Sequence, residues 1–275
     1  MQAGSPQGYI EATKRDRQLD RRFVMGAIIA VSNQQRGVGK TTITLNLARE
    51  LATRGFRVLM VDNDPQADLT TSMSALSPVQ PDALGLYEGH AVDPREVSKD
   101  LFIIGADIGL STVDGQGYEA VFDFKNELLK LKYDYDFIFI DSLPSLGIMH
   151  TAALATSDYL MIVIELSPLL CKGIRDLIES AGKIIKHLNS GLKVLGIVIN
   201  QVVDNDDSNK NIKKCLFDKY PNLAFDAVLS KWTDESGDTR RDRVSRGPEP
   251  DPQCRIMNEE LMKLTDEILR RIERL

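Results

Sequence analysis

The sequence predicts an α/β fold, a doubly wound and mostly parallel sheet with helices on both faces. Short segments rich in β-branched and apolar residues alternate along the chain with segments of helical apolar spacing, which is typical of parallel strands joined by crossover helices. The connections between these segments are short and no internal repeat is visible, so the 275 residues are expected to form one large domain.

The predicted elements follow one another in a regular order. The strand segments are residues 27–31, 57–61, 101–104, 136–141, 158–164 and 193–200. The helical segments are residues 41–52, 118–131, 172–188, 208–220 and 256–274.

Two regions depart from this core. Residues 1–24 are polar and are predicted to form an N-terminal extension to a domain that spans residues 25–275. They are too few for a helix-turn-helix domain, so sequence-specific operator binding is not expected. Residues 233–253 are rich in Arg, Asp, Gly and Pro and are predicted to form an exposed loop.

The last predicted helix carries an apolar stripe that is expected to pack on the domain. The stripe consists of Leu261, Leu264, Ile268, Ile272 and Leu275. A helix that binds a membrane surface is normally basic on its polar face, whereas this one is rich in acids such as Glu259 and Glu273. Membrane binding is therefore not expected.

The composition excludes several classes of protein. The chain is 43% hydrophobic and 27% charged, its longest apolar runs have the length of strands, and its N-terminus is charged. Neither a membrane span nor a secretory signal is therefore expected. Cys171, Cys215 and Cys254 form no metal-binding motif, which fits a reducing cytoplasm. Because the net charge is −6, any contact with DNA needs a local basic patch.

A glycine-containing loop connects the first predicted strand to the first predicted helix. It reads Gly37-Val38-Gly39-Lys40-Thr41-Thr42. Backbone N–H groups in such a loop and at the start of the helix bind phosphate oxygens. Lys40 adds a positive charge to the β- and γ-phosphates, and the Thr41 hydroxyl can ligate Mg²⁺. The usual motif has glycine where Gln34 stands, so this loop departs from the standard pattern.

Acidic residues follow or end two of the predicted strands. Asp62 and Asp64 come after residues 57–61, and Asp141 ends residues 136–141. The carboxyl ends of parallel strands share one edge of the sheet, so these carboxylates are expected to face the same crevice as the phosphate loop. There Asp141 suits a contact with Mg²⁺ through water. Either acidic segment alone could equally be a helix cap or a loop charge, but the three elements in this order are far more specific.

Over roughly residues 26–275 the chain resembles the ParA/MinD branch of the deviant Walker ATPases. The motifs that carry the resemblance are the segment from Asn33 to Thr42, the Asp62-x-Asp64-Pro65-Gln66 segment, the segment from Tyr135 to Leu146, and the strand Gly196-Ile197-Val198-Ile199-Asn200.

The resemblance implies a nucleotide-driven cycle. Two subunits close face to face over two ATP molecules, the closed homodimer binds DNA without sequence preference, and a ParB-like or cargo-adaptor protein stimulates hydrolysis. The resemblance assigns phosphate and Mg²⁺ binding to Lys40 and Thr41, the attacking water to Asp64, support of the metal to Asp62 and Asp141, and contact with adenine to Asn200.

The chain departs from this family at one functional position. The family has a lysine that reaches across the dimer to the partner's ATP, and here Gln35 stands in its place, followed by Arg36 where the family has glycine. The McdA-like members, which position carboxysomes, also lack this lysine. A cation supplied in trans accelerates phosphoryl transfer about 10³–10⁵-fold, so hydrolysis is expected to be weak unless another cation substitutes. The candidates are Arg36, Lys172 and Arg175; alternatively, Arg36 faces solvent and hydrolysis is weak.

Three basic clusters are candidates for the contact with DNA. They are Lys210, Lys213 and Lys214 in a predicted helix, Arg240, Arg241 and Arg243 in the predicted loop, and Arg270, Arg271 and Arg274 near the end of the chain. Lysine and arginine neutralise phosphates in a salt-sensitive, sequence-independent way. Acids lie among these residues, so solvated charged surfaces are the other interpretation.

The function that the sequence predicts is an ATP-dependent switch in the cytoplasm and on the nucleoid. Its cargo would be plasmid or chromosome DNA, or a large protein assembly such as a carboxysome. A MinD-like regulator at the membrane surface is disfavoured by the acidic last helix. A metabolic enzyme on the same fold is the remaining alternative: a reductase needs cluster-ligating cysteines, and a ligase needs a substrate pocket that the sequence does not identify.

Overall fold

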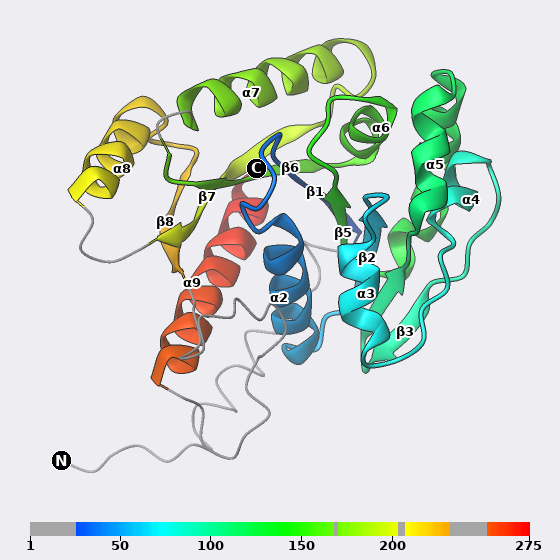
Figure 1. Ribbon diagram of the computed structural model, residues 1–275, viewed down its shortest axis with the longest axis horizontal. Coiled ribbons are helices and arrows are strands. Elements are labelled where there is room, and N and C mark those ends of the chain that lie inside the picture. Colours follow the sequence, from blue (N-terminus) through cyan, green and yellow to red (C-terminus); the bar gives the residue numbers. More distant parts are fainter. Residues whose placement is uncertain (1–25, 168–169, 203–206, 232–251) are drawn as a thin grey trace.

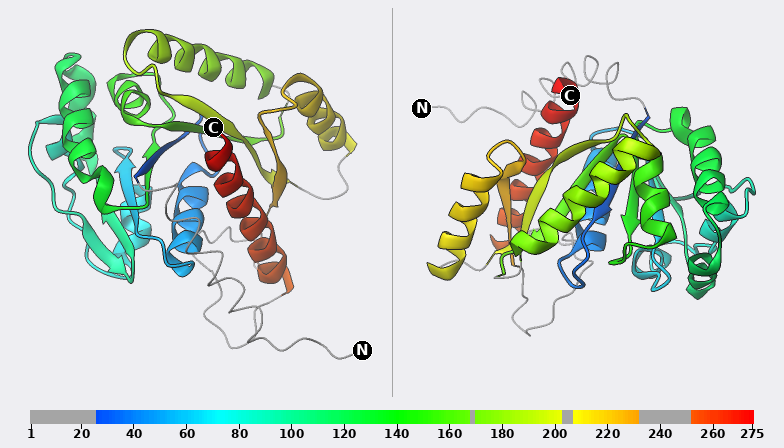
Figure 2. Two further views of the ribbon diagram at one scale, coloured as in Figure 1. Left: turned by 180° about the vertical axis from the view of Figure 1, so that it is seen from behind. Right: turned by 90° about the horizontal axis from the view of Figure 1, so that it is seen from above.

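The computed structural model describes residues 26–167, 170–202, 207–231 and 252–275, with side chains described in all of these except 170–172, 207–210 and 252–255. It confirms the predicted fold class. The strands form one 8-stranded sheet in the order β3-β4-β2-β5-β1-β6-β7-β8 (Figure 1). Helices lie on both faces of this sheet, as the view from above shows (Figure 2).

The strands are β1 (Ala27–Ser32), β2 (Val58–Asn63), β3 (Arg95–Ser98), β4 (Leu101–Ile104), β5 (Phe137–Ser142), β6 (Tyr159–Glu165), β7 (Lys193–Val202) and β8 (Ala224–Ser230). The α-helices are α2 (Lys40–Thr53), α3 (Asp68–Ser74), α4 (Ala83–Tyr87), α5 (Glu119–Leu131), α6 (Ile148–Thr156), α7 (Leu170–His187), α8 (Asp207–Lys219) and α9 (Pro252–Arg274). Two 3-10 helices, η1 (Ile108–Gly115) and η2 (Lys132–Asp134), complete the described elements.

Parallel pairing brings the predicted functional segments to one edge of the sheet. Every strand pair is parallel except β3 with β4 at one side. Strand β5 lies between β1 and β2, and Asp62 pairs in register with Asp141. The loop after β1 and the acids at the ends of β2 and β5 are therefore neighbours, as the sequence predicts.

Two separate apolar cores hold helices against the two faces. In β1 the side chains of Ile28 and Ala30 join the core under α4, α5, α6, α7 and α8. Those of Ile29 and Val31 join the core under α2, α3 and α9. This alternation is the geometry of a strand buried on both faces, and it explains why the strands are apolar along their whole length.

Helix α9 is bonded through side chains to the edge strand β8. Glu267 accepts hydrogen bonds from the N–H groups of Asp226 at 3.0 Å and Ala227 at 3.2 Å. Glu260 accepts one from the N–H of Ser230 at 2.8 Å. Two acids of α9 thus satisfy backbone donors of a strand at the edge of the sheet.

The predicted stripe of α9 is buried except at its end. Leu261, Leu264, Ile268 and Ile272 are buried, whereas Leu275 is 51% exposed and does not join them. In the described parts of the chain, no helix is both long enough and apolar enough to cross a membrane.

Candidate functional site

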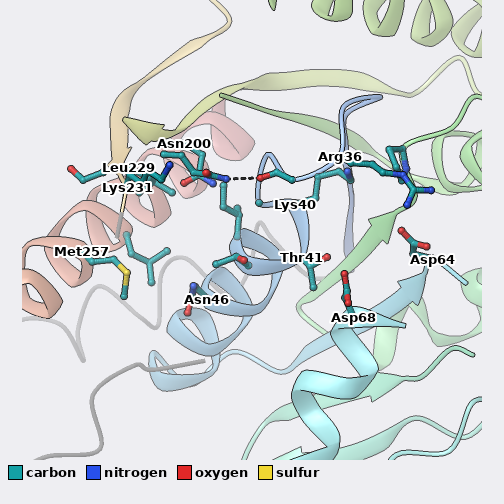
Figure 3. Close-up of a pocket in the computed structure, with 18 of the residues that line it drawn as sticks. Arg36, Lys40, Thr41, Asn46, Asp64, Asp68, Asn200, Leu229, Lys231 and Met257 are labelled. Atoms are coloured by element: carbon teal, nitrogen blue, oxygen red, sulfur yellow. Dashed lines mark hydrogen bonds between the residues drawn. The ribbon is translucent and has the colours of Figure 1, made fainter. Parts of the chain in front are cut away.

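A pocket of about 400 Å³ opens above the loop between β1 and α2 (Figure 3). One end is polar and is lined by Arg36, Asp64 and Asp68. The other end is more apolar and includes Leu229 from β8 and Met257 from α9. This polarity suits a ligand with an anionic part and a flat, less polar part.

The loop requires glycine at two positions. Gly37 has a φ of 78° and Gly39 a φ of 91°, both in the left-handed region. A Cβ atom at Gly39 would lie 2.2 Å from Nδ2 of Asn200, so no side chain fits there. Helix α2 begins directly after Gly39 without a side-chain cap, which leaves its first N–H groups available to an anion.

Three side-chain amides hold this loop from outside. Asn33 accepts a hydrogen bond from the N–H of Gln35 at 2.9 Å and donates one to the carbonyl of Val163 at 2.5 Å. Asn200 and Gln201, at the end of β7, donate to loop carbonyl oxygens. Sequence reasoning identified Asn200 as an adenine contact and overlooked Gln201, although two amides directly after an apolar strand were a visible signal.

Lys40 is a nearly buried cation beneath the pocket. The residue is 8% exposed, and its Nζ lies 3.4 Å from the carbonyl oxygen of Gln35. Burial lowers the pKa of Lys40, while the carboxylates of Asp141 and Asp64 act to raise it. A buried ammonium with one long hydrogen bond is stabilised by an anion such as a nucleotide phosphate.

The side chain of Asp62 is used within the protein. Its Oδ2 accepts hydrogen bonds from the N–H of Thr70 at 2.8 Å and from the Thr70 hydroxyl at 2.6 Å. Its Oδ1 accepts one from the N–H of Asp64 at 3.3 Å. Burial raises the pKa of Asp62 to about 6. A metal contact at Asp62 would compete with these bonds, so the geometry favours a role in positioning the segment that carries Asp64.

Asp141 has the complementary arrangement. It is 2% exposed, and its Oδ1 has no hydrogen-bond partner in the described structure. Burial, and then the charge of Asp62, raise the pKa of Asp141 to about 8, against a hydrogen bond from the Thr41 hydroxyl. A buried carboxylate oxygen without a partner is costly unless a cation or a proton satisfies it.

The residues present fit Mg²⁺. Thr41 and Asp141 offer the oxygen ligands that this ion prefers. Among the described side chains, no group of three or more His, Cys, Asp or Glu could hold a metal ion. A site with so few protein ligands suits an ion held mainly by water and substrate phosphates.

The candidate cations are placed differently. Arg36 lines the pocket, and Figure 3 shows it extending toward Asp64. Arg175 in α7 lies outside the pocket lining, and its Nε is 3.9 Å from a carboxylate oxygen of Asp176. The side chain of Lys172 lies outside the described residues. Only Arg36, of the two described candidates, belongs to the pocket of its own subunit.

The described basic clusters do not form one surface. Lys213 and Lys214 are on α8, which packs on the core opposite to that of α9. Arg270 and Arg274 are exposed near the end of α9, where the carbonyl of Leu275 accepts a hydrogen bond from Lys193 at the start of β7. The pocket lies at the opposite edge of the sheet. The side chain of Lys210, together with Arg240, Arg241 and Arg243, lies outside the described residues.

Arg271 requires a correction to the predicted DNA-binding set. Its guanidinium donates to the carbonyl oxygens of Leu195 and Leu223, both at 3.0 Å, and to Glu267 at 2.7 Å. It also lies 4.0 Å from the ring centroid of Phe225. Because its donors are used in holding α9 to the sheet, Arg271 is not available to DNA phosphates.

Comparison with known proteins identifies the family. The AAA domain family matches residues 26–194. The chain belongs to the ParA/MinD family of AAA domains. The sporulation initiation inhibitor protein Soj of Bacillus subtilis is 32% identical over 65% of this chain and 74% of its own length. The chromosome partitioning protein ParA of Myxococcus xanthus is 31% identical over 68% of each chain.

Three solved structures share the fold of this chain. A putative plasmid partition protein from Borrelia burgdorferi bound to AMPPNP has a TM-score of 0.70 at 23% identity and covers 89% of this chain and 98% of its own. The ATP complex of a Cyanothece McdA variant has a TM-score of 0.70 at 20% identity, covering 86% and 96%. Cobyrinic acid a,c-diamide synthase from Mycobacterium smegmatis, with an ATP analogue and magnesium, has a TM-score of 0.67 at 24% identity, covering 75% and 87%.

Proposed function

We propose that this protein is an ATP-dependent switch that dimerises, binds DNA without sequence preference and positions a cargo, with slow ATP hydrolysis stimulated by a partner. The observation that carries the proposal is the pocket in which the phosphate loop, buried Lys40 and Asp64 converge beside the unpartnered oxygen of Asp141. Phosphoryl transfer depends on such positioning and charge stabilisation.

Within this proposal each pocket residue has a role. The segment Gly37-Val38-Gly39-Lys40-Thr41-Thr42 binds the phosphates of ATP, and Asp64 orients the attacking water. Thr41 and Asp141 hold Mg²⁺, which when bound neutralises phosphate charge. The apolar end of the pocket receives the adenine, where Asn200 retains its carbonyl oxygen as an acceptor because its amide nitrogen is used by the loop.

Arg36 is the cation that we assign in place of the absent family lysine. It lines the pocket of its own subunit on the side of Asp64. A guanidinium binds phosphate oxygens in a bidentate manner and stays charged at all physiological pH values. An arginine in cis would leave hydrolysis possible although Gln35 cannot supply charge. Lys172 and Arg175 remain the alternatives, acting from a second subunit.

Two observations support DNA binding and the transport of a cargo: the similarity to partition proteins and the exposed basic residues. The relative from Myxococcus xanthus is named a chromosome partitioning protein, and one structural neighbour is McdA, so the cargo would be DNA or a large protein assembly. Within the predicted basic clusters, Arg270, Arg274 and Lys214 are described and exposed, and they could neutralise phosphates of nonspecific DNA. The protein would then act in the cytoplasm on the nucleoid, with a ParB-like or cargo-adaptor protein as its stimulating partner.

The test is to measure dimerisation, DNA retention and turnover together, with ATP, ADP or no nucleotide, for the wild type and Asp64→Ala. We expect ATP to drive both dimerisation and salt-sensitive DNA binding. In Asp64→Ala the ATP-dependent dimer should persist while turnover is lost. DNA binding that ignores nucleotide would contradict the switch, and turnover that requires an added small molecule would favour a metabolic enzyme instead.

A further inference from the structure

Two side-chain amides at the end of β7 hold the carbonyl side of the phosphate loop. Asn200 Nδ2 donates to the carbonyl oxygen of Val38 at 2.8 Å, and Gln201 Nε2 donates to that of Gly37 at 2.6 Å. We propose that Gln201 is a positioning residue for nucleotide phosphates, because it fixes a loop peptide whose N–H binds them. This inference rests on the proposed function, since it names what orients the same site.

The argument follows from the geometry of the peptide bond. A planar trans peptide points its C=O and its N–H in opposite directions. The carbonyl of Gly37 shares a peptide with the N–H of Val38, and the carbonyl of Val38 shares one with the N–H of Gly39. With both carbonyls bonded to β7 side chains, both N–H groups point away from β7.

These two N–H groups are donors without a partner. Neither makes a hydrogen bond within the described chain. Gly39 lines the pocket, and Val38, which is itself buried, borders it through the peptide that it shares with pocket-lining Gly37. Successive backbone N–H groups that face one concave space bind anions, so a phosphate in the pocket is the partner that these donors lack.

The backbone of Gln201 supports a functional role. In a regular strand the side chains of consecutive residues point to opposite faces, so Asn200 and Gln201 would not be expected to reach adjacent carbonyls. Gln201 has a φ of 58°, in the left-handed region that non-glycine residues rarely adopt. Such a conformation is unfavourable and persists where the surrounding structure gains from it, often at functional sites.

Gln201 can be tested without disturbing the core. Asn200 is 8% exposed, and its amide packs directly on Gly39, so its replacement would change packing as well as hydrogen bonding. Gln201 is half-buried at the pocket wall and lies outside both apolar cores, so its replacement disturbs packing less. Gln201→Leu removes the amide at similar size, and Gln201→Gly removes the side chain while relieving the left-handed backbone.

The experiment measures the affinity of the full chain for ADP and for pyrophosphate, with the melting temperature in the absence of nucleotide. We expect both variants to bind ADP and pyrophosphate roughly 3- to 10-fold more weakly, the effect of one hydrogen bond. We expect Gln201→Gly to melt at or above the wild-type temperature. Gln80→Leu, the same change at an exposed glutamine outside the pocket lining, is the matched control and should match the wild type.

The outcomes separate this inference from the proposed function. Failure of the wild type to bind ADP would contradict the proposed function. The inference about Gln201 is tested separately, by the ratio of the dissociation constants of variant and wild type. Unchanged ADP affinity in both variants would overturn the role of Gln201. Weaker ADP binding with unchanged pyrophosphate binding would overturn it too, because it would place the effect at the base. If the melting temperature of Gln201→Gly fell together with its affinity for ADP and pyrophosphate, the result would show that Gln201 stabilises the fold and would overturn its role as a positioning residue.

Discussion

Gly39 lies where the phosphate loop, helix α2 and strand β7 meet. Its φ of 91° and its contact with Asn200 leave room for a hydrogen atom and nothing larger. The loop glycine is thus required by two independent causes, a backbone conformation and a neighbouring amide. The first cause follows from the sequence motif, and the second became visible only when β7 was placed beside the loop.

Gly39→Ala is expected to lose nucleotide binding and to destabilise the fold by about 1–3 kcal/mol, because the new methyl group meets Asn200 Nδ2 and the residue is held at positive φ. Calorimetry with ADP and urea unfolding would measure the two effects. Adding Asn200→Ala should recover part of the stability, since it removes the contact but not the backbone strain. A Gly39→Ala protein that binds ADP normally would show that the loop can rearrange.

The acids at the strand ends show how far residue types carry a prediction. Asp62 and Asp141 were both expected near a metal, because each ends an apolar strand. In the structure the Asp62 carboxylate accepts two hydrogen bonds from Thr70, whereas Oδ1 of Asp141 has no hydrogen-bond partner among the described residues. Which of two neighbouring carboxylates is satisfied depends on a threonine eight residues away in α3, and no spacing rule predicts that.

Whether a helix or strand could be predicted from the sequence depended on how regularly its buried apolar residues are spaced. Strands with continuous apolar runs, such as β5, were predicted within one or two residues. The two edge strands were missed. The four residues of β3 are Arg, Glu, Val and Ser and lie largely exposed, and the apolar run of β8 is interrupted by Asp226. Helix α6 was missed because nearly all of it is buried, so it has no polar face and no helical period. Helices α3 and α4 are too short to show a period.

Helix α6 carries His150 into the space between β1 and α7. Its Nδ1 is 3.5 Å from the Ser32 hydroxyl, and its Nε2 is 3.2 Å from the Ser180 hydroxyl. The residue is 1% exposed, and burial lowers the pKa of His150 to about 4. The native protein therefore holds a neutral imidazole, which the unfolded chain protonates below an ordinary pKa of about 6.5.

This histidine predicts a loss of stability on acidification. Its folded pKa lies below its unfolded one, so its contribution is complete above about pH 6.5 and falls as the pH drops toward 4. Between about pH 7 and pH 5 the wild type should lose about 2 kcal/mol of unfolding free energy relative to His150→Gln. Denaturant unfolding at several pH values measures this difference. A difference that does not change with pH would mean that His150 is protonated in the native state or exposed.

At the scale of the whole molecule, the sequence predicted the sheet and the nucleotide edge but not the arrangement of charge. The basic clusters lie on α8 and α9, which pack on opposite faces of the sheet, and Arg271 is used in bonding α9 to the sheet. The acids near these residues in the sequence did not reveal that Arg271 is bonded within the fold while its neighbour Arg270 is exposed. That difference arises because one side of α9 faces the edge strand, and only the packed structure fixes which side.

Whether Arg36 acts on the nucleotide of its own subunit or on that of a second subunit is a question about the whole assembly. Because Arg36 lines its own subunit's pocket near Asp64, we expect it to act in cis. Arg36→Ala should reduce turnover by about 10³-fold or more, as for other cations at phosphoryl-transfer sites. Arg175→Ala, whose side chain lies outside the pocket, should leave turnover close to that of the wild type.

Mixing inactive subunits separates cis from trans action. A mixed dimer of Arg36→Ala and Asp64→Ala subunits has one pocket that keeps Asp64 and lacks its own Arg36. If Arg36 acted across the dimer, the partner subunit would restore that pocket. An equal mixture would then recover up to about a quarter of wild-type turnover, because about half of the dimers are mixed and each of these has one active pocket out of two. If Arg36 acts in cis, each pocket lacks one of its two residues, and turnover of the mixture stays at the level of the separate variants. We expect the second result, because Arg36 already lies beside Asp64 in the single chain.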